Sequence, residues 1–283
     1  MFELSNAMYG QLKQYYPKYD KKIVLHRVNG LDIPFSPEWR NIGVNLSGGA
    51  DSASLCLILG KIIKENNYDC KIHVITFLRC WNTRPWQEPI GIDVYEKLRS
   101  MYPDIIVSRN TNYIPPELEW GVSGPIINGR SGDQIEGSSF NGYISYKLNL
   151  DAVFNATSKN PKADGFENRM AQRDADPEDG NIRNILYITD GTMFVHPYRY
   201  VQKDWIIAQY HLHGAVDLFN MTRSCEGDIN LNASVKAACP TPRDYKHGVT
   251  EVPECGECFW CLERNWALSR LDETIEAINN INE

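Results

Sequence analysis

The stretch NIGVNLSGGADS, residues 41–52, passes from an apolar segment directly into a glycine-rich turn. Residues 41–46 have the composition of a buried strand, and Leu55, Leu59 and Ile62 recur at helical spacing after the turn. The sequence therefore predicts a strand, a tight turn and an amphipathic helix from about residue 53 to residue 66. This order favours an α/β fold in which the helix covers the sheet to which the strand belongs.

Strand-like and helix-like segments continue to alternate after this unit. The predicted strands are 71–77, 104–108, 152–156 and 185–189, and the predicted helices are 91–102, 131–150, 203–212 and 263–281. We therefore expect a Rossmann-like parallel sheet with helices on both faces. The remaining expectations are an irregular, aromatic-rich extension at 1–40, a long polar loop at 159–184 and a strand-like run at 216–221.

The composition is that of a globular protein and narrows the classes of function. With 283 residues and a net charge of -7, the chain lacks the basic balance that nucleic-acid binding favours, so we expect a small-molecule substrate. No stretch approaches the ~20 apolar residues of a membrane span, and the N-terminus lacks the pattern of a signal peptide. We expect a cytoplasmic protein whose eight cysteines serve as thiols or metal ligands rather than disulfides.

The glycine turn offers the groups of an anion site. Gly48 and Gly49 let the backbone approach a ligand closely, and the helix start supplies free N–H groups. Ser47 and Ser52 add hydroxyl groups. The turn lacks the Gly-Lys-Ser/Thr end of a Walker loop and the GxGxxG spacing of a dinucleotide fingerprint. The alternative is an ordinary strand-to-helix turn that Asp51 or Ser52 caps.

Three closely spaced cysteines predict a metal site near the carboxyl end. Cys255, Cys258 and Cys261 form two consecutive CxxC steps, a spacing that places thiolates on one metal ion. A tetrahedral zinc ion needs a fourth ligand, for which Cys225 and Cys239 are the nearby candidates. An iron–sulfur cluster is the competing interpretation, because three nearby cysteines and a distant one can also hold a cluster.

The string Ser-Gly-Gly-x-Asp-Ser at 47–52 resembles the pyrophosphate loop of the PP-loop ATP pyrophosphatase superfamily. With Thr222-Arg-Ser-Cys225 and the CGxCxxCxxR pattern from Cys255 to Arg264, the chain is similar to the 7-cyano-7-deazaguanine synthase family over about residues 41–265. The resemblance implies three regions, which are an N-terminal extension at 1–40, a PP-loop nucleotide-binding domain at 41–215 and a small helical zinc module at 216–283.

The resemblance also implies roles for individual residues. The residues that would hold the pyrophosphate are Ser47, Gly48, Gly49, Asp51 and Ser52, and those beside the adenine are Thr76 and Phe77. The residues that would take part in catalysis are Asp51, Ser52, Lys203 and Arg130, although an exposed lysine at a helix start is the competing interpretation of Lys203. The implied zinc ligands are Cys225, Cys255, Cys258 and Cys261.

The activity that the resemblance implies is that of an ATP- and Mg²⁺-dependent ligase. Such an enzyme adenylates 7-carboxy-7-deazaguanine, ammonia displaces AMP to give an amide, and a second activation dehydrates the amide to the nitrile. The resemblance further implies a structural zinc ion and a homodimer. The chain departs from the family where residues 155–161 read NATSKNP instead of an acidic, tyrosine-containing segment, where Ser131 replaces an asparagine, and where 29 residues separate Cys225 from Cys255.

Two further classes of function stay open on the sequence alone. One is another adenylating enzyme of the superfamily, such as an RNA sulfur transferase, which would need a reactive cysteine near the ATP site. Cys80 is the candidate, although the acidic balance of the chain counts against a large RNA partner. The other is a nucleotide-binding or conjugating homologue that lacks synthase activity, which the altered substrate segment at 155–161 keeps open.

Overall fold

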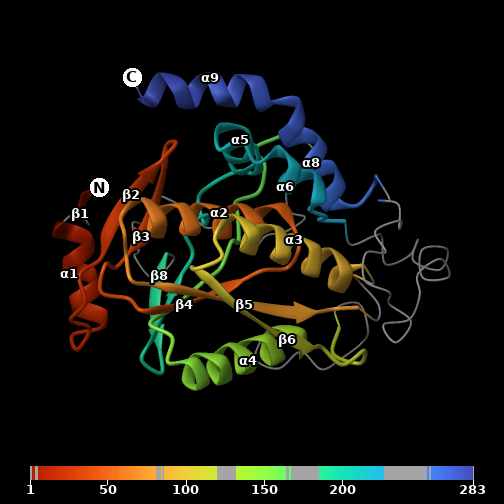
Figure 1. Ribbon diagram of the computed structural model, residues 1–283. Coiled ribbons are helices and arrows are strands. Elements are labelled where there is room, and N and C mark those ends of the chain that lie inside the picture. The colour runs from red at the N-terminus through yellow and green to blue at the C-terminus, as the bar shows by residue number, and fades with distance from the viewer. Residues whose placement is uncertain are drawn as a thin grey trace.

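The computed structural model describes residues 2–3, 6–80, 84, 86–119, 132–163, 166, 185–225, 254 and 256–282. A six-stranded sheet in the order β6-β5-β4-β7-β9-β8 forms its centre (Figure 1). The strands are β4 (Asn41–Asn45), β5 (Lys71–Leu78), β6 (Ile106–Tyr113), β7 (Ala152–Phe154), β8 (Leu186–Thr189) and β9 (Thr192–Val195). Neighbouring strands are parallel, except that β8 runs antiparallel to β9 at one edge. The predicted α/β class with a mostly parallel sheet is therefore confirmed.

Helices cover both faces of this sheet, as expected (Figure 1). One face carries α2 (Ala50–Glu65), α3 (Gln87–Met101), α5 (Lys203–Leu212) and α6 (Val216–Met221), and the opposite face carries α4 (Gly132–Leu148). Two further helices, α8 (Phe259–Ser269) and α9 (Leu271–Asn282), contact α5 on the side away from the sheet. None of the described helices is long and apolar enough to cross a membrane.

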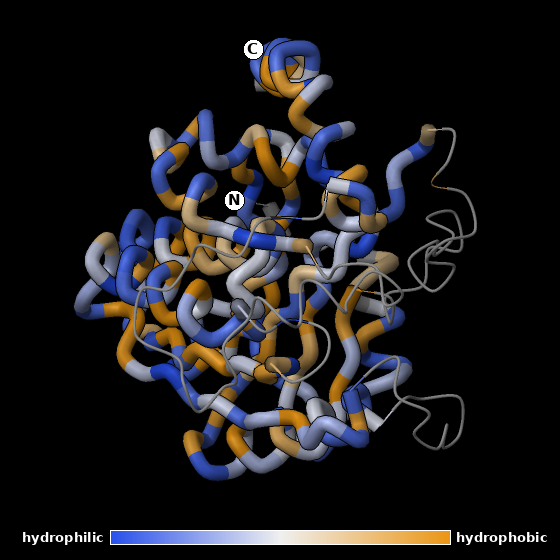
Figure 2. The backbone as a smooth tube through the Cα atoms, turned by 90° about the vertical axis from the view of Figure 1, so that its right-hand side faces the viewer, coloured by the Kyte–Doolittle hydropathy of each residue, from blue (hydrophilic) through white to orange (hydrophobic). Residues whose placement is uncertain are grey.

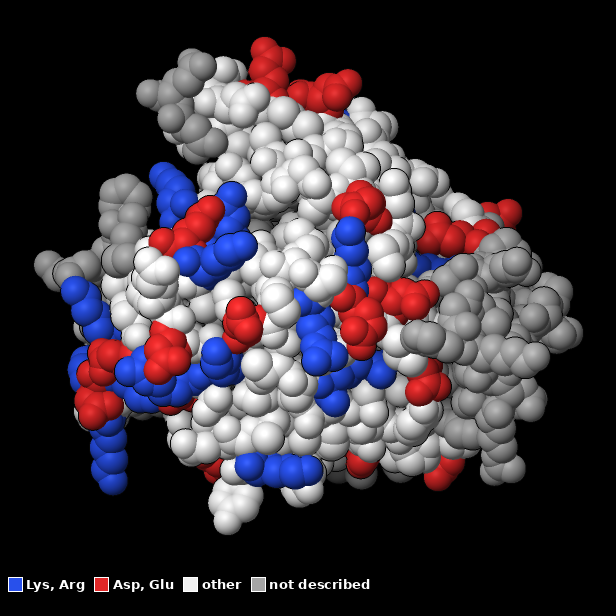
Figure 3. Space-filling view, in the orientation of Figure 1, with Lys and Arg blue, Asp and Glu red and all other residues white. Residues whose placement is uncertain are grey.

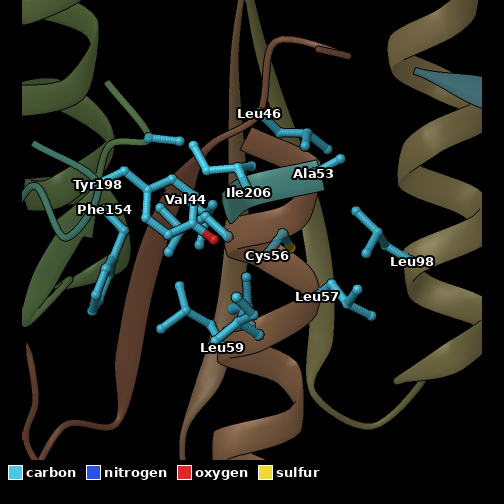
Figure 4. Close-up of a cluster of buried hydrophobic side chains, with 14 of the residues drawn as sticks. Val44, Leu46, Ala53, Cys56, Leu57, Leu59, Leu98, Phe154, Tyr198 and Ile206 are labelled. Atoms are coloured by element: carbon cyan, nitrogen blue, oxygen red, sulfur yellow. The ribbon is translucent and has the colours of Figure 1, made fainter. Parts of the chain in front are cut away.

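Helix α2 lies at the middle of the core, between β4 and α3 (Figure 4). Twelve of its 16 residues are buried, so it packs on nearly all sides rather than along one stripe. Cys56, Leu57 and Leu59 contribute to this core and are at most 1% exposed. The helix begins three residues earlier than the spacing predicted, because the Ala53 N–H already bonds the Gly49 carbonyl at 3.2 Å. The glycine turn therefore leads directly into the first helical turn.

The N-terminal segment is regular structure, and the expectation of an irregular extension is wrong. It forms β1 (Phe2–Glu3), α1 (Asn6–Tyr15), β2 (Val24–Val28) and β3 (Leu31–Phe35), whose strands make a separate antiparallel sheet. Asn29 and Gly30 join β2 to β3 with φ angles of 46° and 78°, the left-handed geometry of a two-residue hairpin turn. Trp39, which follows this hairpin, packs edge-on against Phe154 of β7 at a centroid distance of 5.8 Å. The segment therefore shares the core of the main sheet.

The carboxyl end also differs from the prediction. Residues 216–221 form helix α6 rather than a strand, and the expected helix at 263–281 is divided into α8 and α9 at Arg270. Asp204 of α5 accepts hydrogen bonds from the Arg270 guanidinium at 3.4 Å and from the Thr274 hydroxyl at 3.2 Å. These bonds draw the first turn of α9 onto α5 and so change the direction of the chain at Arg270.

The surface visible in Figure 3 carries both signs of charge in alternation rather than one basic field. Acidic side chains gather over α9, whose first half contains Asp272, Glu273 and Glu276. Hydrophobic and hydrophilic residues alternate along α9, which stands at one end of the molecule (Figure 2). The helix therefore packs with one side only and keeps its acidic side in solvent.

Candidate functional site

A cleft of about 1940 Å³ opens at the carboxyl ends of the parallel strands. Its walls include Asn45 at the end of β4, Phe77 at the end of β5, Asn155 after β7 and His196 after β9. Ligands of open α/β sheets bind in crevices at this edge, because the loops and helix N-termini that follow the strands all converge there. The predicted glycine turn opens onto the same cleft through Ser47, Gly49, Asp51 and Ser52.

The turn leaves the start of α2 available to an anion. Gly49 is the residue before the helix, and no side chain caps it, so the first-turn N–H groups keep the positive end of a 16-residue helix. Gly48 has a φ angle of 82°, and a Cβ there would lie 3.3 Å from the Gly91 nitrogen. Instead of capping the helix, the Ser52 hydroxyl accepts the Ser47 N–H and donates to the Gly49 carbonyl, both at 3.1 Å. These contacts weigh against an ordinary capped turn.

Asp51 is fixed by two side chains from distant parts of the sequence. Both of its carboxylate oxygens lie 2.7 Å from Lys203 Nζ, and the Ser158 hydroxyl donates to Oδ2 at 3.3 Å. The side chain of Asp51 is 19% exposed and lines the cleft, while Lys203 and Ser158 fix its position. Glu263 of α8 approaches the same ammonium group, with Oε2 3.5 Å from Lys203 Nζ.

The lysine is therefore neither an exposed side chain nor a free cation at the cleft surface. Lys203 is 1% exposed and Glu263 is 0% exposed, and both lie at the level of the first turn of α2. Removing such charges from water is costly unless each is paired, and here one ammonium serves two carboxylates. The three groups together carry a formal charge of −1 beside the positive end of α2.

Two buried tyrosines hold the first turn of α2 from the side of α5. The Tyr210 hydroxyl donates to the Ala50 carbonyl, and the Tyr198 hydroxyl lies 3.1 Å from Ser54 Oγ. Burial raises the pKa of both tyrosines, so both phenols stay protonated at neutral pH. Neutral hydrogen bonds therefore anchor the start of the helix without adding a charge beside it.

The end of β5 supplies a second wall of the cleft. Phe77 lines it and packs edge-on against Phe140 of α4, with centroids 5.9 Å apart. Thr76 is 1% exposed, and within the described part of the chain its hydroxyl has no hydrogen-bond partner. Gln87, which the sequence did not single out, connects this strand to the turn by accepting the Arg79 N–H at 2.8 Å and donating to the Ser47 carbonyl at 3.3 Å.

A row of polar side chains lines the cleft on the α4 side of the sheet. Strands β4, β7 and β9 are in register, and the residues directly beyond this register are Asn45, Asn155 and His196. Adjacent strands are about 4.8 Å apart, so these three residues lie side by side. Helix α4 faces them with Asn141 and Ser145, which are 8% and 5% exposed.

Several buried polar atoms in and beside this row form no hydrogen bond with the described residues. The atoms Asn45 Oδ1, Asn141 Oδ1, Ser145 Oγ and His196 Nε2 are buried and have no partner among the described residues. An unmet buried polar atom costs about 1–3 kcal/mol, so a hydrogen-bonding ligand would be favoured there. Burial, with a smaller contribution from Arg199, lowers the pKa of His196 to about 4 and keeps its ring neutral.

The predicted metal centre brings three thiols together. The sulfur atoms of Cys225, Cys258 and Cys261 all lie within 4.8 Å of one another, and all three residues are buried. Three thiolates around one zinc ion, each about 2.3 Å from it, lie about 3.8 Å apart, so the cluster fits a single ion after a small contraction. Hydrogen bonds with Cys225 and Cys258, followed by burial, raise the pKa of Cys261, and a cation would reverse this by stabilising the thiolates.

The metal centre lies against the glycine turn. The Arg223 N–H, two residues before Cys225, donates to the Gly48 carbonyl at 3.0 Å. A Cβ on Gly49 would lie 3.4 Å from Ser224 Oγ, an ordinary contact distance, so the two segments lie side by side here. Arg264 of α8 fixes the same segment through the Thr222 carbonyl and hydroxyl, at 3.2 and 3.1 Å.

Some predicted residues lie outside the described part of the chain, and some contacts were not predicted. Arg130, Cys239 and Cys255 are outside it, as are residues 164, 165 and 167–184 of the expected loop at 159–184. Glu263 gave no signal in the sequence, because it reads as one more acidic residue in a helix. Ser158 lies in the segment that departs from the family pattern, and only the fold shows that it contacts Asp51.

Comparison with known proteins gives a weak structural likeness only. No known protein family matches the chain, and no curated protein sequence matches it. Among solved structures, the chain is similar to the U34-tRNA thiolase NcsA from Methanococcus maripaludis, which was determined with its 4Fe–4S cluster. The two share 11% sequence identity and a TM-score of 0.41, over 95% of this chain and 78% of the thiolase. A likeness at this level carries no conclusion about activity.

Proposed function

We propose that the protein is an ATP-dependent carbon–nitrogen ligase of the PP-loop superfamily, of the 7-cyano-7-deazaguanine synthase type. The observation that carries the proposal is the uncapped start of α2 at the carboxyl edge of the sheet, beside a carboxylate that Lys203 holds in place. Backbone N–H groups at a helix start suit a phosphate chain, and a fixed carboxylate suits the magnesium ion that accompanies it.

In this proposal ATP lies along the cleft from the turn to the end of β5. The N–H groups at Gly49 and the start of α2 bind the β- and γ-phosphates, and the base lies near Thr76 and Phe77. Asp51 is the residue that would hold Mg²⁺, which supplies charge neutralisation on the departing pyrophosphate. These donors are fixed before the reaction begins, so they stabilise the developing charge without a large rearrangement.

The acid substrate would bind on the α4 side of the cleft, along the row formed by Asn45, Asn155 and His196. Its carboxylate attacks the α-phosphate, which gives an acyl adenylate and releases pyrophosphate. Ammonia then attacks the acyl carbon, and AMP leaves with the acyl C–O electron pair, which gives the amide. A second adenylation, on the amide oxygen, and loss of AMP with a proton give the nitrile. The substrate that we propose is 7-carboxy-7-deazaguanine.

The remaining features of the proposal are a structural zinc ion and a cytoplasmic, homodimeric enzyme. Cys225, Cys258 and Cys261 would supply three of the four sulfur ligands, with Cys255 as the fourth. When every position on the ion is filled by sulfur, zinc has no open site for chemistry and contributes to stability alone.

The test is product analysis. The protein is incubated with MgATP, ammonium and 7-carboxy-7-deazaguanine, AMP is quantified, and the products are identified by mass spectrometry. We expect AMP release that depends on the acid, with amide and nitrile products. Ser52→Ala should abolish the reaction because it removes both bonds that shape the turn, whereas Ser100→Ala, on the exposed side of α3, is the matched control. No acid-dependent AMP in the wild type would refute the proposed reaction.

An RNA sulfur transferase is the second candidate. Such an enzyme would need a reactive cysteine near the ATP site, and Cys80 is the candidate for this role. Burial, followed by the charges of Glu88 and Glu119, raises the pKa of Cys80 to about 12. At neutral pH the group is therefore a thiol, which is a poor nucleophile. AMP release that required RNA and a sulfur donor, and that Cys80→Ser abolished, would favour this candidate over the ligase.

A further inference from the structure

The described parts of the metal-binding region, residues 222–225 and 256–269, are called the metal module here. The module touches the glycine turn at three points. The Arg223 N–H bonds the Gly48 carbonyl, Ser224 lies beside Gly49, and Glu263 reaches Asp51 through Lys203. All three contacting residues stand within two positions of a thiol of the metal cluster, because Arg223 and Ser224 precede Cys225 and Glu263 follows Cys261.

Glu263 is the contact whose chemistry goes beyond packing. It is 0% exposed, it lies on α8, and its Oε2 is 3.5 Å from Lys203 Nζ. The same ammonium group lies 2.7 Å from both oxygens of Asp51. Because Lys203 has almost no exposed surface, its position is set by these two carboxylates and by the start of α5. Any movement of α8 therefore changes where Lys203, and with it Asp51, is held.

We propose that Glu263 is a positioning residue that couples the metal centre to the nucleotide turn. With metal bound, α8 and residues 222–225 are tied together through Cys225, Cys258 and Cys261, so Glu263 holds Lys203 against Asp51. Without metal, no ion ties Cys225 to Cys258 and Cys261, so residues 222–225 and α8 can separate and release the turn. This inference rests on the proposed nucleotide site and adds a regulatory link to it.

The coupling has a quantitative signature. If metal strengthens nucleotide binding by some factor, nucleotide must strengthen metal binding by the same factor, because linkage between two sites is reciprocal. We expect each ligand to strengthen the affinity for the other by about fivefold or more, which is the lower end of ordinary coupling between two sites. Replacing Glu263 by glutamine keeps its shape but removes the charge that attracts Lys203, so the factor should fall toward one.

The experiment measures binding rather than turnover. The nucleotide is adenosine 5′-(α,β-methylene)triphosphate with Mg²⁺, which resists cleavage between the α- and β-phosphates. Its dissociation constant is measured by calorimetry on zinc-loaded and on chelated protein. Zinc affinity is measured by competition with a coloured chelator, with and without saturating nucleotide. The proteins are the wild type, Glu263→Gln and Glu276→Gln, the last being the same change at an exposed position of α9.

We expect reciprocal coupling in the wild type and in Glu276→Gln. Glu263→Gln should still bind zinc, bind nucleotide more weakly than the zinc-loaded wild type, and show coupling of less than about twofold. A purely structural role would lower the melting temperature of Glu263→Gln without changing the coupling, which would overturn the assignment. Independent binding of zinc and nucleotide in the wild type would overturn it too, whatever the variant does. Absence of nucleotide binding in the zinc-loaded wild type would instead refute the proposed function.

Discussion

Replacing Lys203 by methionine is the sharpest test of the charge cluster behind the turn. The change keeps the length of the side chain but removes the ammonium group that serves Asp51 and Glu263. Glu263 is 0% exposed, so its charge would lose this ammonium group without gaining access to water. Loss of one partner of a buried pair costs about 3–5 kcal/mol, because the remaining charge keeps its desolvation penalty. At about 2–4 °C per kcal/mol, the melting temperature should fall by roughly 6–20 °C.

Differential scanning calorimetry can separate this cost from the loss of an ordinary surface ion pair. Lys97→Met is the matched control, because Lys97 pairs with Asp217 at the surface, where the two side chains are 32% and 59% exposed. Such a pair contributes about 0–1 kcal/mol, so the control should change the melting temperature by less than about 4 °C. The double variant Lys203→Met, Glu263→Gln removes both buried charges and should be more stable than Lys203→Met alone. Equal melting temperatures for Lys203→Met and Lys97→Met would refute the cluster as described.

Three further predictions concern the turn, the metal and the effect of acid. Gly48→Ala should lower both stability and nucleotide affinity, since the φ angle of 82° is strained for alanine and a Cβ would crowd Gly91; unchanged calorimetric binding would contradict this. Cys225→Ser should lose zinc, measured by elemental analysis, whereas Cys239→Ser should retain about one ion per chain; the reverse result would change the ligand assignment. His196 has a pKa of about 4 in the folded protein, below its unfolded value, so its contribution to stability is present above about pH 6.5 and is lost as the pH falls toward 4. Replacing His196 by glutamine should reduce this acid sensitivity in urea titrations at pH 7 and pH 5, and an unchanged difference would exclude the effect.

Local periodicity was sufficient to predict the elements whose burial follows a simple pattern. Helix α5 occupies the predicted residues 203–212, and β5 differs from its prediction at 71–77 by one residue. These segments have continuous apolar character or a regular stripe, so their local preference and their tertiary environment agree. The mostly parallel sheet followed from the alternation of such segments, without knowledge of any contact.

The errors arose where one short signal or one long-range contact determined the structure. Asn29-Gly30 between two apolar runs is a strong hairpin signal, but the prolines and aromatic residues around it are typical of a loop. The division between α8 and α9 has no glycine or proline to indicate it, because it depends on Asp204, which is 66 residues before Arg270. Strand β9 is not predicted, because it is only four residues long and so short a segment carries little periodicity.

The candidate site was predictable in its parts but not in its connection. The sequence identified the turn and the cysteines from local patterns, and it identified Lys203 only through the family resemblance. That Lys203 lies between Asp51 and Glu263 depends on the packing of α5 against both α2 and α8, which no local pattern encodes. Contacts between residues 60 to 152 positions apart in the sequence therefore decide the electrostatics of the site.

This packing explains how one site can accept a ligand that carries both signs of charge. Magnesium nucleotide brings a polyanionic phosphate chain together with a divalent cation. The uncapped N-terminus of α2 would provide fixed positive potential for the phosphates of such a ligand, and the ammonium group of Lys203 is buried against Asp51. Asp51, Lys203 and Glu263 together carry −1, and the exposed part of that charge lies on Asp51. If Lys203 instead reached the phosphates directly, Asp51 and Glu263 would both lose this ammonium group. Under the proposed function, the backbone of the turn would bind the phosphates and Asp51 the cation, while Lys203 fixes the position of Asp51 beside the turn.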